Sequence, residues 1–145
     1  MLSLQNFKFV NVTPPAAIID NAAAVTAAVD TKGFDECAFL VQLGALDIAV
    51  AALKLQESDS AGSGYTDIAG ADFSVSPLTL PSATDDNKLY LITVNLVGRK
   101  RYLDLSLTLG DGAAGTYVAV LAILGRGQQT PATAANRGLG QQAIV

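Results

Sequence analysis

The sequence predicts an all-β domain, an antiparallel β-sandwich or jelly-roll-like fold with an extended N-terminal arm and a polar C-terminal tail. Three observations predict it. Tyr102 to Leu109 alternates strictly between apolar and polar residues, as a strand with one buried face does. Turn residues recur about every 8 to 12 positions, which indicates about seven or eight short strands. Helical composition is confined to Ala16–Val29, where a first strand is an open alternative.

The 145 residues are enough for one domain. Its parts are an arm (1–31), a sandwich core (32–126) and a tail (127–145). In the core, apolar segments bounded by turn residues predict strands at 39–43, 48–56, 65–68, 73–75, 89–97, 102–109 and 116–124. The hydrophobic parity changes within 48–56, so we expect a bulge or a change of sheet near Ala51 and Ala52. Pro77 and Pro81 confine their segment to a loop or an edge strand.

Two of these segments have apolar residues on both faces. In 89–97 one face carries Tyr90 and Ile92 while the other carries Leu89 and Leu91, and residues 98–101 that follow form a connection of hairpin length. In segment 116–124 both faces are apolar from Tyr117 onward, and valine and isoleucine contribute to the run. It predicts a strand that is buried on both sides.

Composition excludes several function classes. Half of the residues are hydrophobic and 15% are charged, against about 25% charged in an ordinary soluble domain. The chain has no histidine and a single cysteine, which removes histidine-based catalytic triads and the commonest metal ligand. We therefore predict that the protein is not an enzyme and uses no cofactor or metal. A net charge of −4 argues against direct nucleic-acid binding, and we expect no membrane segment or targeting signal.

Acidic residues cluster at two places that suggest either a calcium site or solvated turns. They are Asp67 with Asp72, and Asp85 with Asp86; neither matches an EF-hand loop, so turns are the favoured interpretation. The adjacent acidic residues 35 and 36 would face opposite ways on a strand, which disfavours an acid–base pair. Cys37 begins a strand and is predicted to be a buried structural thiol, because the chain has no histidine to activate it.

The chain has few charged residues, and two of its predicted strands are apolar on both faces. We therefore expect that part of its apolar surface is covered by other subunits. The residues predicted to form a subunit interface are Tyr117, Ala119, Leu121, Ile123 and Ile144. The residues predicted to contact a partner lie in the arm and in a basic cluster, namely Phe7, Phe9, Val10, Val12, Arg99, Lys100 and Arg101. For the basic cluster, a solvated turn that discourages edge aggregation is the simpler interpretation.

Several segments together resemble the capsid decoration, or cement, proteins of tailed bacteriophages. They are 29–35, 53–58, 70–73 and 87–109. The resemblance covers roughly 29–126 and implies a compact β-fold that forms a homo-oligomer, a trimer. Such a trimer binds the major capsid protein on the outer surface of the shell and bridges capsomers, often through an N-terminal arm. It implies a virion protein made in the host cytoplasm.

Alternatives remain open at the level of sequence. Neck and tail proteins of virions share these general sequence features. A non-catalytic ligand- or carbohydrate-binding jelly-roll module is a second class, although lectin sites favour exposed aromatic platforms and the chain has no tryptophan. An enzyme on a β-barrel such as a cupin is disfavoured, because that chemistry uses histidine-rich metal sites.

Overall fold

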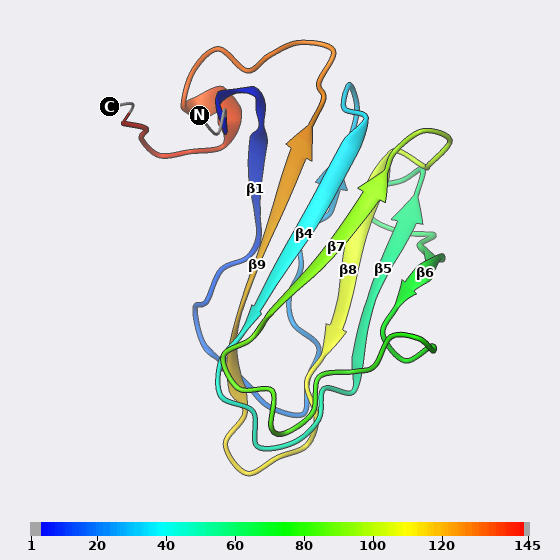
Figure 1. Ribbon diagram of the computed structural model, residues 1–145, viewed down its shortest axis with the longest axis vertical. Coiled ribbons are helices and arrows are strands. Elements are labelled where there is room, and N and C mark those ends of the chain that lie inside the picture. Colours follow the sequence, from blue (N-terminus) through cyan, green and yellow to red (C-terminus); the bar gives the residue numbers. More distant parts are fainter. Residues whose placement is uncertain (1–3, 144–145) are drawn as a thin grey trace.

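The computed structural model describes residues 4–143, which fold into two layers of antiparallel strands (Figure 1). The strands are β1 (Lys8–Thr13), β2 (Ile18–Ile19), β3 (Val29–Asp30), β4 (Glu36–Leu43), β5 (Ala52–Ser58), β6 (Thr66–Asp72), β7 (Leu89–Asn95), β8 (Tyr102–Thr108) and β9 (Thr116–Gly125). The described helices are single 3-10 turns, η1 (Leu4–Asn6) and η2 (Ala135–Arg137). The prediction of an all-β antiparallel sandwich is confirmed.

Each layer is one antiparallel sheet. The first has the strand order β1-β9-β4-β7, with the short β2 also pairing β9. The second has the order β3-β8-β5-β6. Strands that are adjacent in sequence therefore often lie in different sheets, and the chain crosses between the layers repeatedly.

The core lies between the two sheets and follows the period-two alternation of their strands. On β8 the side chains of Leu103, Leu105 and Leu107 are buried and the intervening polar residues are not. On β4 every second residue from Cys37 to Leu43 is buried. Fully burying one such leucine stabilises the fold by about 1.5–3 kcal/mol, so this alternation determines which face of each strand points inward.

The predicted N-terminal arm does not extend from the body. Residues 8–13 form β1, which pairs with β9 from Lys8 opposite Leu124 onward. Without β1, the backbone groups along this side of β9 would be left unpaired on an edge. The Ala16–Val29 stretch contains no helix; it crosses between the sheets, with β2 on the way and β3 at its end.

Two further expectations need correction. The β7–β8 connection is not a hairpin, because β7 pairs with β4 in the first sheet and β8 pairs with β5 in the second. Both strands bury their apolar side chains between the layers, which requires them to face each other across the core. Strand β9 is buried on one side only: Val118 and Val120 point inward, whereas Tyr117 is 53% exposed.

Candidate interaction surface

The outward side of the first sheet is largely apolar and remains partly exposed, with Gln42, Thr93 and Asn95 as polar members of its rows. Residues directly opposite each other in an antiparallel pair point to the same face, so the register defines this side. Across one row Leu91 pairs with Leu40, and Leu40 with Leu121. We call the full set the outer apolar face: it comprises Phe9, Ala38, Leu40, Leu89, Leu91, Tyr117, Ala119, Leu121 and Ile123.

The exposure of this face is large for apolar side chains. Leu89 and Leu91 are each 59% exposed. Leu40, Leu121 and Ile123 are half-buried by their neighbours in the sheet. An ion pair between Glu36 and Arg126, 3.1 Å apart, lies at one end of the face. A contiguous apolar surface of this kind marks an interaction site.

The outward side of the second sheet shows the contrast. There β8 carries Asp104, Ser106 and Thr108, and β5 carries Lys54 and Gln56. Lys54 and Gln56 both bond Asp67 of β6, at 2.8 and 2.6 Å. The outward side of the second sheet is therefore polar and suited to contact with water, whereas the outward side of the first sheet is largely apolar.

All the described residues that were predicted as a subunit interface lie on the outer apolar face. Tyr117, Ala119, Leu121 and Ile123 follow one another along the outward side of β9. Ile144 lies outside the described residues. Sequence reasoning missed the contributions of β4 and β7, although the opposite parity of Leu89 and Leu91 was visible as the second apolar face of their segment.

The arm residues do not form a separate contact surface. Phe9 lies opposite Ile123 and joins the outer apolar face. Val10 lies opposite Ala122, on the inward side, and packs against the core. Val12 is 2% exposed and belongs to the core, so it is not available to a partner. Phe7 precedes β1 and is half-buried.

The basic cluster is used within the chain. Arg101 makes two bonds to the Asp30 carboxylate, 2.9 and 2.7 Å long, and these hold the pKa of Asp30 at about 2. Arg99 lies 3.4 Å from Glu57, and Lys100 donates a 3.3 Å hydrogen bond to the Thr66 hydroxyl. These residues connect the β7–β8 loop to the strands of the second sheet, which favours the interpretation as a structural turn.

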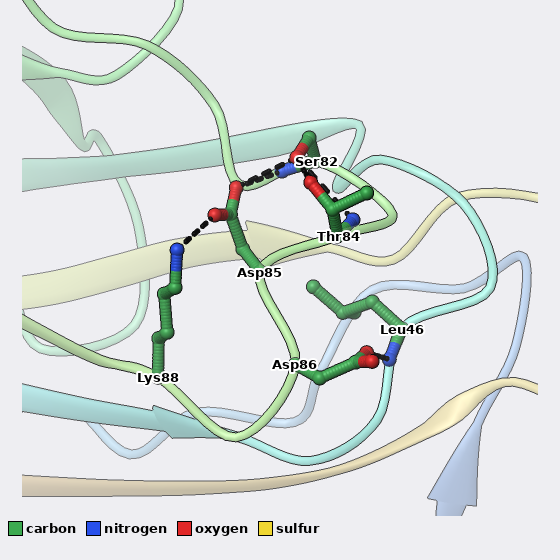
Figure 2. A network of polar contacts seen from close by, with 6 residues as sticks. All are labelled: Leu46, Ser82, Thr84, Asp85, Asp86 and Lys88. Carbon is green, nitrogen blue, oxygen red and sulfur yellow. Dashed lines mark hydrogen bonds and ion pairs between the residues drawn. The ribbon is translucent and has the colours of Figure 1, made fainter.

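Asp85 and Asp86 lie among the turns before β7, as predicted, whereas Asp67 lies within β6 and Asp72 ends that strand. The carboxylate of Asp85 accepts hydrogen bonds from the Ser82 backbone and hydroxyl, at 2.7 and 2.8 Å, and pairs with Lys88 at 2.6 Å (Figure 2). Asp86 accepts a 2.6 Å bond from the Leu46 backbone N–H. This network attaches the loop before β7 to the loop after β4. Within residues 4–143 no group of three His, Cys, Asp or Glu side chains is placed to hold a metal ion.

Cys37 is buried on the inward side of β4, as predicted. Burial removes water that would solvate the thiolate and raises the pKa of the thiol to about 12. Its sulfur is therefore protonated at physiological pH, which fits a core residue.

Comparison with known proteins gives a distant structural likeness. No family model matches the sequence, and no curated protein matches it. Among solved structures, the crystal structure of the SPBc2 prophage-derived protein YomS is similar, with a TM-score of 0.48 and 14% identity over 81% of this chain and 91% of that chain. At this distance the likeness carries no argument about function. No helix within residues 4–143 is long and apolar enough to cross a membrane.

Proposed function

We propose that this protein is a non-catalytic structural component of a phage particle. It assembles into a homo-oligomer, a trimer, and binds the outer surface of the capsid, where it stabilises the shell by bridging capsomers. The observation that carries the proposal is the outer apolar face: a sandwich of this size has no internal use for a second apolar surface on the same sheet. The trimer and the capsid are what the sequence resemblance to decoration proteins adds.

The chemistry of the face supports self-association. Between Ala38 and Gln42, the outward side of β4 and of its two neighbours carries mainly leucine, alanine and isoleucine, together with the neutral side chains of Thr93 and Gln42, and no charged side chain. Each chain carries a net charge of −4, so copies meet most easily through an uncharged patch. Three such faces can pack around a three-fold axis, and an obligate interface of this kind resembles a domain core cut in half.

Attachment to a shell would then need no strong single contact. A trimer offers the same contact three times to a rigid lattice, and linked contacts multiply avidity without new chemistry. Here the rigid sandwich supplies the platform that holds the three contacts at a fixed spacing.

Two measurements test the proposal. Light scattering on the purified protein is expected to give three times the chain mass. Co-sedimentation with assembled shells of the capsid protein encoded by the same genome is expected to pellet the protein in a fixed ratio to the shell. A monomer that stays in the supernatant would contradict the proposal; an oligomer that ignores shells but binds isolated tail or neck assemblies would move it to those structures.

A further inference from the structure

The free edge of β7 is a second uncovered feature of the first sheet. Strand β7 pairs with β4 from Leu89 to Asn95 without a register shift. No described strand pairs with its other side. In an antiparallel ladder, pairs that exchange hydrogen bonds alternate with pairs that do not. The bond from the Leu96 N–H to the Asp35 carbonyl identifies which pairs carry bonds.

By this alternation, Tyr90, Ile92 and Val94 use their backbone groups toward β4. The residues between them direct N–H and C=O away from β4 toward the open edge, and they are Leu89, Leu91, Thr93 and Asn95. An extended chain beside β7 would find a regular row of donors and acceptors.

The other long edges of the sandwich are protected. The edge strand β1 has a register shift between Asn11 and Thr13, and the tail lies along it with Gly138 against the Phe9 carbonyl. The edge strand β6 carries Asp67 and a shift in its register with β5. Natural sheets use bulges, charges and covering segments to prevent edge pairing. Strand β7 has no charged residue or proline and no bulge, so its edge is open to pairing.

A groove accompanies this edge. It has a volume of about 340 Å³ and lies between β7 and β6, with Ile68 and Ala71 on the β6 side. The core is less tightly covered here than under the neighbouring strand: Val94 is 7% exposed, whereas Phe39 on β4 is 0% exposed. A strand added beside β7 would direct every second side chain into this groove. The groove therefore has the position of a missing strand.

The chemistry of the groove selects an uncharged occupant. Its charged lining residue is Arg99, which already pairs with Glu57. The rest of the lining is apolar or neutral, so a charged strand would bury charge without a partner. Residues 139–145 of the tail carry no charged side chain and no proline, so they can lie beside β7 without burying a charged side chain.

The tail of the same copy is badly placed to reach this groove. The 3-10 turns η1 and η2, near the two ends of the described residues, lie beside β1 (Figure 1), and β1 and β7 are opposite edges of the sheet. Arg137 holds the tail there through a 2.7 Å bond to the Gln5 carbonyl. The tail of a neighbouring copy does not have to cross this sheet to reach the groove, although its Gln142 must give up a 2.7 Å bond to its own Arg137.

We propose that residues 139–145 of one copy add a strand to the β7 edge of the next copy and direct alternate side chains into the groove between β6 and β7. The interface is head-to-tail, because the edge and the tail are different surfaces, and such an interface forms a ring when the rotation between successive copies closes, as it does in a trimer with a three-fold rotation. This inference rests on the proposed homo-oligomer and names a contact that would hold it together. Strand addition supplies main-chain hydrogen bonds, and the groove supplies side-chain specificity.

The first test uses the chain shortened to end at Gly138 and a synthetic peptide of residues 138–145. Hydrogen exchange of the backbone amides reports on the groove directly, whatever the oligomeric state. At nine-tenths occupancy, exchange at Leu91 and Thr93 is expected to slow about tenfold. The amides of Ile92 and Val94, already bonded to β4, are expected not to change. The control peptide carries Gln141→Pro, which removes a donor and is expected to have no effect.

The second test uses the full chain. Thr93→Pro removes an outward N–H without touching the β4 pairing, and Thr93→Val keeps it. In Thr93→Pro the concentration of half-dissociation of the oligomer is expected to rise at least about tenfold, a loss of about 1.4 kcal/mol. Thr93→Val is expected to behave as the wild type.

The outcomes separate the two proposals. Unchanged exchange at Leu91 and Thr93 with millimolar peptide, or equal protection by the control peptide, would overturn the strand addition even if the wild type is an oligomer. Protection by the peptide in a protein that is monomeric at full length would contradict the proposed trimer while supporting the groove as a strand-binding site.

Discussion

Leu40 of β4 lies directly opposite Leu121 of β9, and both side chains point away from the core. Leu91 continues the row on β7. A leucine pair at the centre of a sheet usually marks the buried side, yet here the buried side is the other one, with Phe39 and Ala122 opposite each other at 0% exposure. The first sheet thus carries two apolar faces, and one of them is free.

Leu121→Lys tests the outer apolar face. An ammonium at the centre of the face is expected to reduce the oligomer to monomers, because burying an unpaired charge costs far more than the contact provides. Stability of the monomer is expected to stay within about 0.5 kcal/mol, since the side chain points outward. Light scattering and urea denaturation measure the two effects. Ser106→Lys, on the outward side of the second sheet, is the matched control and should leave the mass unchanged.

Gly138→Ala tests the docking of the tail on β1. Gly138 has a φ of +77°, and an added Cβ would overlap the Phe9 carbonyl oxygen. We expect a loss of about 1–3 kcal/mol in unfolding free energy, or release of the tail and faster exchange around Arg137. Gly140→Ala is the control, because nothing lies within 4 Å of its would-be Cβ. Equal effects of the two substitutions would contradict this docking.

The Asp30–Arg101 pair predicts an acid-sensitive contribution to stability. The pKa of Asp30 falls from its ordinary value of 3.8 to about 2, through the hydrogen bonds from Arg101. A carboxyl group with a lowered pKa stabilises the fold above its unfolded pKa, and this contribution disappears as pH falls from about 4 to about 2. Both side chains are nearly half exposed, so the effect is expected to stay below about 1 kcal/mol.

Urea denaturation at pH 7 and near pH 2 measures this effect as the difference between the wild type and Asp30→Asn. The difference is expected to be present at pH 7 and to vanish in acid. In the Arg101→Gln background, Asp30→Asn should make little difference at either pH. A wild-type advantage that persists undiminished in acid would argue against the pair as its origin.

Cys37 provides a test of the core. The thiolate is the reactive form of cysteine, and burial both raises the pKa of Cys37 to about 12 and blocks access. The native protein is expected not to react with a thiol reagent at pH 8, and to react with one equivalent in concentrated urea. Absorbance of the released chromophore measures both. Cys37→Ala combined with Thr93→Cys, on the open β7 edge, should react without denaturant; fast labelling of native Cys37 would contradict the packing.

Some strands could be predicted because their residues obey one dominant requirement. In β8 every inward residue is leucine and every outward residue is polar, so the period-two pattern alone gives the strand and its buried face. The predicted strand 48–56 was wrong for residues 48–51, where the alternation of apolar and polar residues does not match that of the rest of the segment. Its parity changes where the chain leaves the loop, and β5 begins only at Ala52.

The pairing of strands could not be predicted from the same pattern. The short loop after β7 has the length of a hairpin, yet β7 pairs with β4 in the first sheet and β8 pairs with β5 in the second. The basic residues of that loop looked like a contact patch. Their partners, Asp30 and Glu57, are distant in sequence and became visible only once β3 and β5 were placed beside them.

The sequence by itself determined an all-β sandwich, a buried Cys37 and more apolar surface than one core requires. These properties depend on the alternation and composition of single strands, which are local. Tertiary structure alone decided where the surplus lies. Only the register brings Leu40, Leu91 and Leu121 into one row, and only the strand order leaves the β7 edge open while β1 is covered by the tail. Pairing joins residues far apart in the chain, so the alternation within one strand does not specify which strand lies beside it.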